Sequence, residues 1–207
     1  MILSKDPLNL IITGVGGQGN VLASQLIGRA LVRENFYVTI GETYGASQRG
    51  GAVMSHLRIS KESQFSPLIA EGQADIIVAL EPVEALRVIS QYGNPSVAVI
   101  INSRPIYPLV VTVGEAEYPS PEKIRETIGE LARKAWFVDA SEIALSSGSP
   151  ILANIIMVGA LAGTELIPLT RENFEEAIKE SFPGPHLSDN LKAFARGVEL
   201  TRGHSGL

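Results

Sequence analysis

A glycine-rich segment joins a short apolar run to an amphipathic run near the start of the chain. The apolar run, residues 9–13, is uninterrupted and rich in β-branched side chains, as expected of a strand buried on both faces. In the run that follows, residues 20–34, apolar side chains recur at every third or fourth position, as a helix requires. The glycines of residues 14–19 are therefore predicted to connect a strand directly to a helix, as in an α/β fold.

The predicted turn has the properties of an anion-binding loop. Glycine allows positive φ angles and close approach of the backbone, and the N-terminus of a helix presents unpaired N–H groups to a negative charge. The glycine spacing also fits the G-x-G-x-x-G pattern of dinucleotide-binding proteins, in which Glu42, at the end of the next predicted strand, would bind the ribose. Simple packing of a strand against a helix explains the same glycines equally well. The candidate ligand-contacting residues of the loop are Gly14, Gly16, Gly17, Gln18 and Gly19.

A second glycine-rich segment, residues 44–51, follows the next predicted strand. Gln48 and Arg49 carry planar groups with several hydrogen-bond donors, a composition suited to a phosphate, a carboxylate or a partner's backbone. Hydrogen bonds from Arg49 to carbonyl groups of its own loop are the structural alternative. Because each segment begins where a strand should end, both are predicted to lie on one rim of the sheet, where open α/β sheets bind ligands. The candidates in this segment are Tyr44, Gln48, Arg49 and Gly50.

Strands and helices alternate along the first half of the chain. Strands are predicted at 8–13, 37–42, 52–59, 75–80 and 97–102, and helices at 20–34 and 82–92. The strand at 52–59 follows the strand at 37–42 with no helix between them, which predicts some antiparallel pairing. The predicted fold class is therefore α/β: a three-layer, Rossmann-like open sheet, mostly parallel with some antiparallel strands, and with helices on both faces.

The second half of the chain is predicted to end in helices. Its segments are a short strand at 110–113, a helix at 121–134, a strand at 136–139, a short helix at 140–145, an apolar helix at 151–162 and two terminal helices. Asn154 lies within the apolar helix, where an unpaired amide is costly, so it either hydrogen-bonds a neighbouring loop or contacts a ligand or partner. Nothing along residues 1–207 indicates a linker, and one domain is the simpler prediction.

The composition excludes several classes of function. The chain contains no cysteine, so it cannot hold an iron–sulfur cluster through thiolates, and its three histidines are not spaced as metal ligands. No metal site and no catalytic residue are predicted. A net charge of −5 argues against nucleic acid as a partner. No apolar run is long enough to span a membrane and no signal segment is evident, so the cytoplasm is the expected compartment.

Several segments match one known family. They are residues 14–19, Glu42 with Tyr44-Gly45, 48–51, 56–59, 74–81, Asn154 and 190–194. In these segments the chain resembles the gamma subunit, or gamma domain, of the 2-oxoacid:ferredoxin oxidoreductases. Within that family, residues 48–51 are most similar to the small (beta) subunit of indolepyruvate:ferredoxin oxidoreductase. The resemblance covers nearly the whole chain, and the pairing of two glycine-rich loops makes it specific.

The resemblance implies the activity of the complex to which such a subunit belongs. That activity is CoA-dependent oxidative decarboxylation of a 2-oxoacid, such as indolepyruvate or another arylpyruvate, to acyl-CoA, CO2 and reduced ferredoxin. Thiamine diphosphate and iron–sulfur clusters are expected on partner subunits, with no cofactor bound by this chain alone. Ferredoxin is expected to interact through the complex, and the family suggests two copies of this chain, as in a homodimer.

The resemblance leaves the role of the two loops open. They are expected either to bind the phosphates of the co-substrate CoA or to close the active-site entrance, with Arg49 supplying the positive charge. Two alternatives belong to other classes of function. One is a stand-alone dinucleotide-binding Rossmann oxidoreductase, and the other is a purely structural interaction subunit whose loops dock the catalytic partner.

Overall fold

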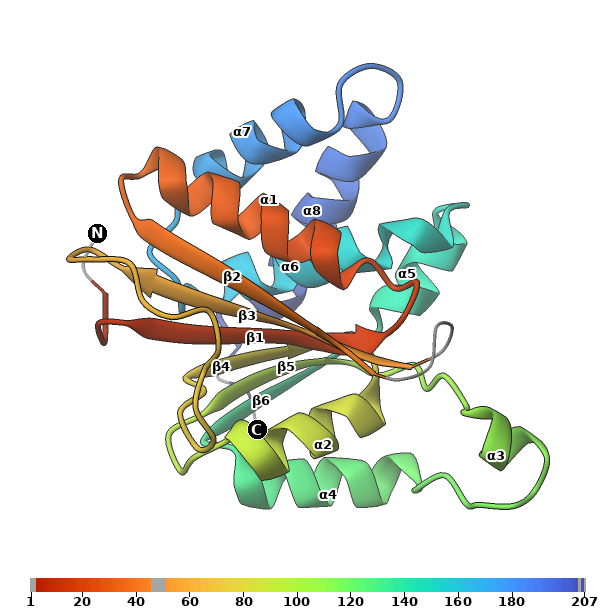
Figure 1. Ribbon diagram of the computed structural model, residues 1–207. Coiled ribbons are helices and arrows are strands. Elements are labelled where there is room, and N and C mark those ends of the chain that lie inside the picture. Colours follow the sequence, from red (N-terminus) through yellow and green to blue (C-terminus); the bar gives the residue numbers. More distant parts are fainter. Residues whose placement is uncertain (1–2, 46–50, 205, 207) are drawn as a thin grey trace.

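A mixed sheet of six strands forms the centre of the protein (Figure 1). The computed structural model describes residues 3–45, 51–204 and 206. In spatial order the strands are β2 (Tyr37–Tyr44), β3 (Ala52–Ser60), β1 (Leu8–Val15), β4 (Ile76–Ala79), β5 (Ala98–Asn102) and β6 (Lys134–Val138). Strands β1, β4, β5 and β6 are parallel, whereas β3 runs antiparallel to both β1 and β2. The predicted mixture of parallel and antiparallel pairing is confirmed.

Helices cover both faces of the sheet, as predicted (Figure 1). One face carries α1 (Asn20–Arg33), α5 (Ala140–Ser146), α6 (Ala153–Gly163), α7 (Arg171–Ser181) and α8 (Leu187–Thr201), with a short 3-10 turn at Pro150–Leu152. The other face carries α2 (Pro82–Tyr92) and α4 (Pro121–Leu131). Within the described ranges, no helix is both long and apolar enough to cross a membrane.

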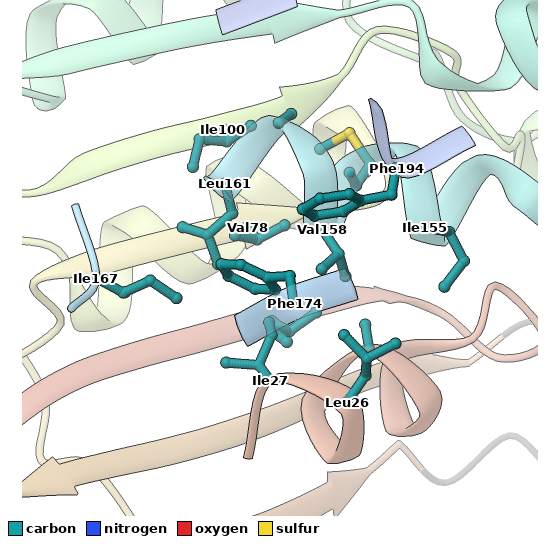
Figure 2. Packing of buried hydrophobic residues seen from close by; sticks show 14 of the residues in the cluster. Leu26, Ile27, Val78, Ile100, Ile155, Val158, Leu161, Ile167, Phe174 and Phe194 are labelled. Carbon is teal, nitrogen blue, oxygen red and sulfur yellow. The ribbon is translucent and has the colours of Figure 1, made fainter. Parts of the chain in front are cut away.

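The larger core lies between the sheet and the α6–α8 layer. Successive side chains of a strand point to opposite faces, so Leu10 and Ile12 enter this core while Ile11 enters the one beneath α2 and α4. Figure 2 shows Phe174 of α7 and Phe194 of α8 packed in the larger core, with ring centroids 5.4 Å apart. Helix α6 is apolar on all sides because it lies in the middle of this layer.

Helices α6 and α8 approach each other closely through glycines. A Cβ placed on Gly159 would overlap the carbonyl oxygen of Phe194, and Gly197 faces Gly159 from α8. The hydroxyl of Thr201 donates a 2.7 Å hydrogen bond to the carbonyl oxygen of Ala160 across the same contact. Small residues therefore determine the distance between these two helices.

The predicted short strand at 110–113 is wrong, because this segment forms the helical turn α3 (Leu109–Thr112). β-Branched residues favour a strand only where another strand can pair with them. The segment leaves the carboxyl end of β5 and projects away from the sheet (Figure 1), and its backbone bonds are local, from Thr112 N and Val111 N to Pro108 O. The position beside β5 is taken by β6.

The boundaries around β6 also differ from the prediction. The helix expected to reach residue 134 ends at Leu131, because Lys134 already pairs with Ala98 in the sheet. Strand β6 accordingly begins at Lys134 rather than at Trp136, and it ends at Val138. Asp139, the predicted last residue of this strand, instead precedes the first turn of α5.

Candidate functional site

The two glycine-rich loops meet at the carboxyl edge of the sheet, as predicted. Gly16 N donates a 2.9 Å hydrogen bond to the carbonyl oxygen of Gly51, which joins the first loop to the end of the second. Gly45 N donates to the carbonyl oxygen of Ala52 at 2.8 Å, so the second loop is closed at its base. Gln48, Arg49 and Gly50, the candidates at its centre, lie outside the described residues.

The side chain of Gln18 holds the first loop in shape. Its Oε1 accepts a hydrogen bond from Val15 N at 2.7 Å, and its Nε2 donates to the carbonyl oxygen of Leu80 at 2.7 Å. The carboxamide therefore ties the loop to the end of β4. A Cβ on Gly14 would lie 2.6 Å from Gln18 Oε1, so Gly14 is required for packing rather than for contact with a ligand.

The remaining glycines place the start of α1 at an open backbone surface. Gly17 and Gly19 have φ angles of 100° and 88°, which L side chains rarely adopt. Gly19 is the N-cap of α1 and provides no side-chain hydrogen bond to the first turn. The first N–H groups of a helix have no partner within the helix, so those of α1 are available to an anion.

A cavity of about 460 Å³ lies beside this helix start. It is bounded by the first loop, by the ends of β4 and β5 and by the N-terminal part of α6. Its apolar wall includes Leu22, Leu80, Ile106, Ile151 and Met157, and its polar groups include Asn102, Arg104, Ser141 and Asn154. A mostly apolar cavity with a few convergent polar groups is the usual form of a small-molecule site.

Asn154 links the apolar helix α6 to the glycine loop. A Cβ on Gly19 would overlap the amide nitrogen of Asn154, so the two residues are in close contact. Asn154 is 3% exposed, and its Oδ1 has no hydrogen-bond partner in the described part of the chain. Because an unpaired buried carbonyl costs about 1–3 kcal/mol, this atom is poised to accept a hydrogen bond from a ligand.

Two other predicted site residues lie away from the cavity. The Glu42 carboxylate accepts hydrogen bonds from the Ser24 hydroxyl at 3.2 Å and the Ser55 hydroxyl at 2.7 Å, and thereby links α1 to the sheet. Tyr44 is exposed at the end of the edge strand β2. The cavity therefore combines Gly17, Gln18 and Gly19 with Asn154, but not with Glu42 or Tyr44.

Three polar residues of the cavity were not predicted from the sequence: Asn102, Arg104 and Ser141. The Asn102 amide donates to the carbonyl oxygen of Leu80 at 3.1 Å and to the Ser141 hydroxyl at 2.9 Å, which joins the ends of β4 and β5 to α5. A signal was present: Asn102 and Arg104 follow the apolar run of β5, at the same edge of the sheet as the glycine loops.

Glu81, another residue that was not predicted to belong to the site, fixes the segment that carries Arg104. It is 1% exposed and caps α2, accepting a 2.9 Å hydrogen bond from Glu84 N. Its other oxygen accepts a hydrogen bond from Ile106 N at 3.3 Å and another from the Tyr118 hydroxyl. Burial, and then the hydrogen bond and charge of Glu81, raise the pKa of Tyr118 above its ordinary value.

The cavity lies where the direction of the helical connections reverses. β1 and β4 are parallel neighbours, yet the helices that follow them, α1 and α2, cover opposite faces of the sheet. Open α/β sheets bind their ligands in the crevice at such a switch point. The fold is therefore that of an open α/β protein, and an uncapped helix N-terminus at the switch point is typical of sites that bind an anionic group.

Comparison with known proteins defines the family. The sequence matches the pyruvate ferredoxin/flavodoxin oxidoreductase family over residues 9–200, and the chain belongs to this family. It is 42% identical over 190 residues to indolepyruvate oxidoreductase subunit IorB of Archaeoglobus fulgidus, with 92% of this chain and 93% of the relative aligned. It is 38% identical over 200 residues to the protein of the same name from Thermococcus kodakarensis, covering 96% and 98% of the two chains.

A solved structure shares the fold. Pyruvate oxidoreductase subunit PORC of Thermotoga maritima superposes with a TM-score of 0.71 at 24% identity, covering 95% of this chain and 97% of the other. The resemblance that was predicted from the paired glycine loops is thereby confirmed, both for the family and for its indolepyruvate branch.

Proposed function

We propose that this chain is the gamma-type subunit of a 2-oxoacid:ferredoxin oxidoreductase whose substrate is indolepyruvate or another arylpyruvate. The observation that carries the proposal is the family match over residues 9–200, together with 38% and 42% identity to two indolepyruvate oxidoreductase subunits. The complex would break the bond between the carboxylate and carbonyl carbons and release CO2. The acyl group would pass to the thiol of CoA, and the electrons to ferredoxin.

The redox and decarboxylation chemistry is assigned to partner subunits. Thiolate ligation of an iron–sulfur cluster requires cysteine, and this chain has none. The partner or partners would therefore carry the clusters, together with thiamine diphosphate, and would interact with ferredoxin. Isolated from these partners, the chain is expected to be inactive.

The chain's own contribution is binding of CoA at the cavity beside α1. The N–H groups at the start of α1 are oriented to bind a phosphate, and the apolar wall suits the body of an organic ligand. Asn154 offers an unpaired buried carbonyl oxygen, which can accept a hydrogen bond from CoA. From the sequence, Arg49 is expected to add a positive charge from the second loop.

The environment of Glu42 favours CoA over a dinucleotide. A ribose-binding acid must present a free carboxylate to the ligand. Both oxygens of Glu42 already accept hydrogen bonds from serine hydroxyls, and Glu42 does not line the cavity. A stand-alone NAD or FAD enzyme is therefore the weaker proposal.

The test starts from the complex purified anaerobically with its native partners. CoA-dependent CO2 release is measured with indolepyruvate, phenylpyruvate and pyruvate, and an arylpyruvate is expected to give the highest kcat/KM. Asn154→Ala is expected to raise the KM for CoA about tenfold, as for loss of one ligand hydrogen bond, without raising the KM for the 2-oxoacid. A lone chain that co-purifies with a dinucleotide would contradict the proposal.

Asn190→Ala is the matched control for Asn154→Ala. Asn190 is also a buried asparagine in a helix, but its amide donates a 2.8 Å hydrogen bond to the carbonyl oxygen of His186, away from the cavity. The control is expected to lower the melting temperature without changing the KM for CoA. An equal effect of both substitutions on that KM would show that Asn154 acts only through stability.

A further inference from the structure

Arg104 contributes a positive charge to the lining of the cavity. It supplies the one positively charged side chain among the described residues that line the cavity, and 47% of that side chain is exposed at the mouth. Its Nη1 lies 3.4 Å from Oε1 of Glu142, whose side chain is 71% exposed. Exposed ion pairs contribute little to stability, so the guanidinium can exchange Glu142 for another anion at small cost.

The backbone around Arg104 is held firmly on both sides. Ser103 N donates a 2.9 Å hydrogen bond to the carbonyl oxygen of Val138, at the end of β6. Ile106 N donates to the buried carboxylate of Glu81 at 3.3 Å. The position of the Arg104 backbone is therefore fixed relative to the cavity, while its side chain keeps its freedom.

A second anion-binding group lies on another wall of the cavity. The start of α1 presents N–H groups there, which are donors to an anion. The buried, unpaired Oδ1 of Asn154 also belongs to the cavity lining, and as an acceptor it suits an N–H or O–H group of the ligand rather than an anionic oxygen. Leu22, Leu80 and Met157 contribute apolar surface to the same cavity. The site thus suits a ligand that carries two separate anionic groups and an apolar portion.

We propose that Arg104 binds the ribose 3′-phosphate of CoA while the start of α1 binds the diphosphate. CoA carries these two groups apart from each other, and a guanidinium forms paired hydrogen bonds to a phosphate monoester. Glu142 is the competitor that holds the guanidinium when CoA is absent. This inference rests on the proposed function, since it requires that the cavity binds CoA.

Dephospho-CoA, which lacks the 3′-phosphate, is the probe that tests Arg104. Binding of CoA and dephospho-CoA to the native complex is measured by calorimetry for the wild type and for Arg104→Gln. The wild type is expected to bind CoA about tenfold more tightly than dephospho-CoA, as for loss of one charged contact. Arg104→Gln is expected to weaken binding of CoA but not of dephospho-CoA, so that the two ligands bind equally well. Arg104→Lys is expected to retain part of the preference for CoA.

Glu142→Gln removes the competitor and should tighten CoA binding, but have no effect in the Arg104→Gln background. Arg196→Gln is the control, because Arg196 is an exposed arginine of α8 that pairs with Glu199. An unchanged ratio in Arg104→Gln would overturn the inference and leave the proposed function standing. A wild-type complex that binds neither CoA nor dephospho-CoA would overturn both.

Discussion

At the scale of single residues, Glu81 combines several structural roles. Its buried carboxylate caps α2 and accepts hydrogen bonds from both ends of the segment that projects between β5 and α4, at Ile106 and at Tyr118. Because Arg104 and Ile106 line the cavity, the position of this cavity wall depends on Glu81. One acidic residue thus connects the end of β4 to the shape of the candidate site.

Tyr118 provides a test of this arrangement at high pH. Its pKa is raised in the folded state, so its contribution to stability is complete below the ordinary tyrosine pKa of about 10 and is lost as the pH rises further. In a spectrophotometric titration, Tyr118 is expected to stay un-ionised until the protein unfolds. The folded wild type and Tyr118→Phe should therefore show the same number of ionising tyrosines, while the wild type loses stability more steeply above pH 10.

Tyr107→Phe is the control for that titration. The Tyr107 ring packs edge-to-face against Tyr118, and Tyr107 is 58% exposed. Removing the Tyr107 hydroxyl leaves the hydrogen bond between Tyr118 and Glu81 intact. Tyr118→Phe is expected to lower the free energy of unfolding by about 1.5–3 kcal/mol, as for a lost hydrogen bond to a charged group. Early ionisation of Tyr118 in the folded protein would contradict the assigned hydrogen bond.

The sequence predicted some site residues by position and could not predict their partners. Asn154 was predicted from one polar residue in an apolar helix, and the structure places it against Gly19. Glu42 was equally visible as an acid at a strand end, but its two serine partners come from α1 and β3. Which of two such residues faces a cavity depends on packing between distant segments, which a local pattern does not contain.

At the scale of elements, the contact between α6 and α8 leaves no space for a side chain at Gly159. Gly159→Ala places a methyl group against the backbone of α8, which cannot move without displacing Phe194 from the core. The expected loss is about 1–3 kcal/mol of the free energy of unfolding, as for overpacking of a core. Urea unfolding monitored by circular dichroism measures this loss.

Gly129→Ala is the matched control in a helix. Gly129 lies in α4, and a Cβ on it would meet nothing within 4 Å. The same substitution is therefore expected to stabilise the protein by about 0.5–1 kcal/mol, because alanine is the better helix former. Equal effects at the two glycines would show that helix propensity, and not the α6–α8 distance, determines both.

Strands and helices with a clear apolar pattern of their own were predicted well. A segment whose structure depends on whether a neighbouring strand is available was not. The strand at the start of the chain and helix α1 are defined by their own apolar patterns, and the structure confirms both. The segment at 110–113 has the β-branched composition of a strand but no neighbouring strand with which to pair. Because β6 occupies the position beside β5, the segment finds no strand partner and forms a helical turn instead. The order of strands in the sheet cannot be predicted from the sequence of this segment alone.

At the scale of the whole molecule, exposed apolar side chains suggest where the catalytic partner binds. The projecting segment exposes Leu109 by 75%, Tyr107 by 58% and Val113 by 57%, and Ile151 at the mouth of the cavity is 75% exposed. All of them lie at the carboxyl edge of the sheet, beside the candidate site. Several large apolar side chains exposed along one edge of a sheet are typical of a surface that another protein covers.

Under the proposed function, a partner that covers this surface would lie beside the CoA site. Leu109→Ser and Val113→Ser are therefore expected to weaken assembly of the complex about tenfold each, as for central apolar residues of an interface, without lowering the melting temperature of the isolated chain. Val32→Ser is the control, since Val32 is 57% exposed but lies near the end of α1 that is remote from the glycine loop. Affinity between the purified subunits is measured by calorimetry, and a loss in Val32→Ser equal to that in Leu109→Ser would place the interface elsewhere.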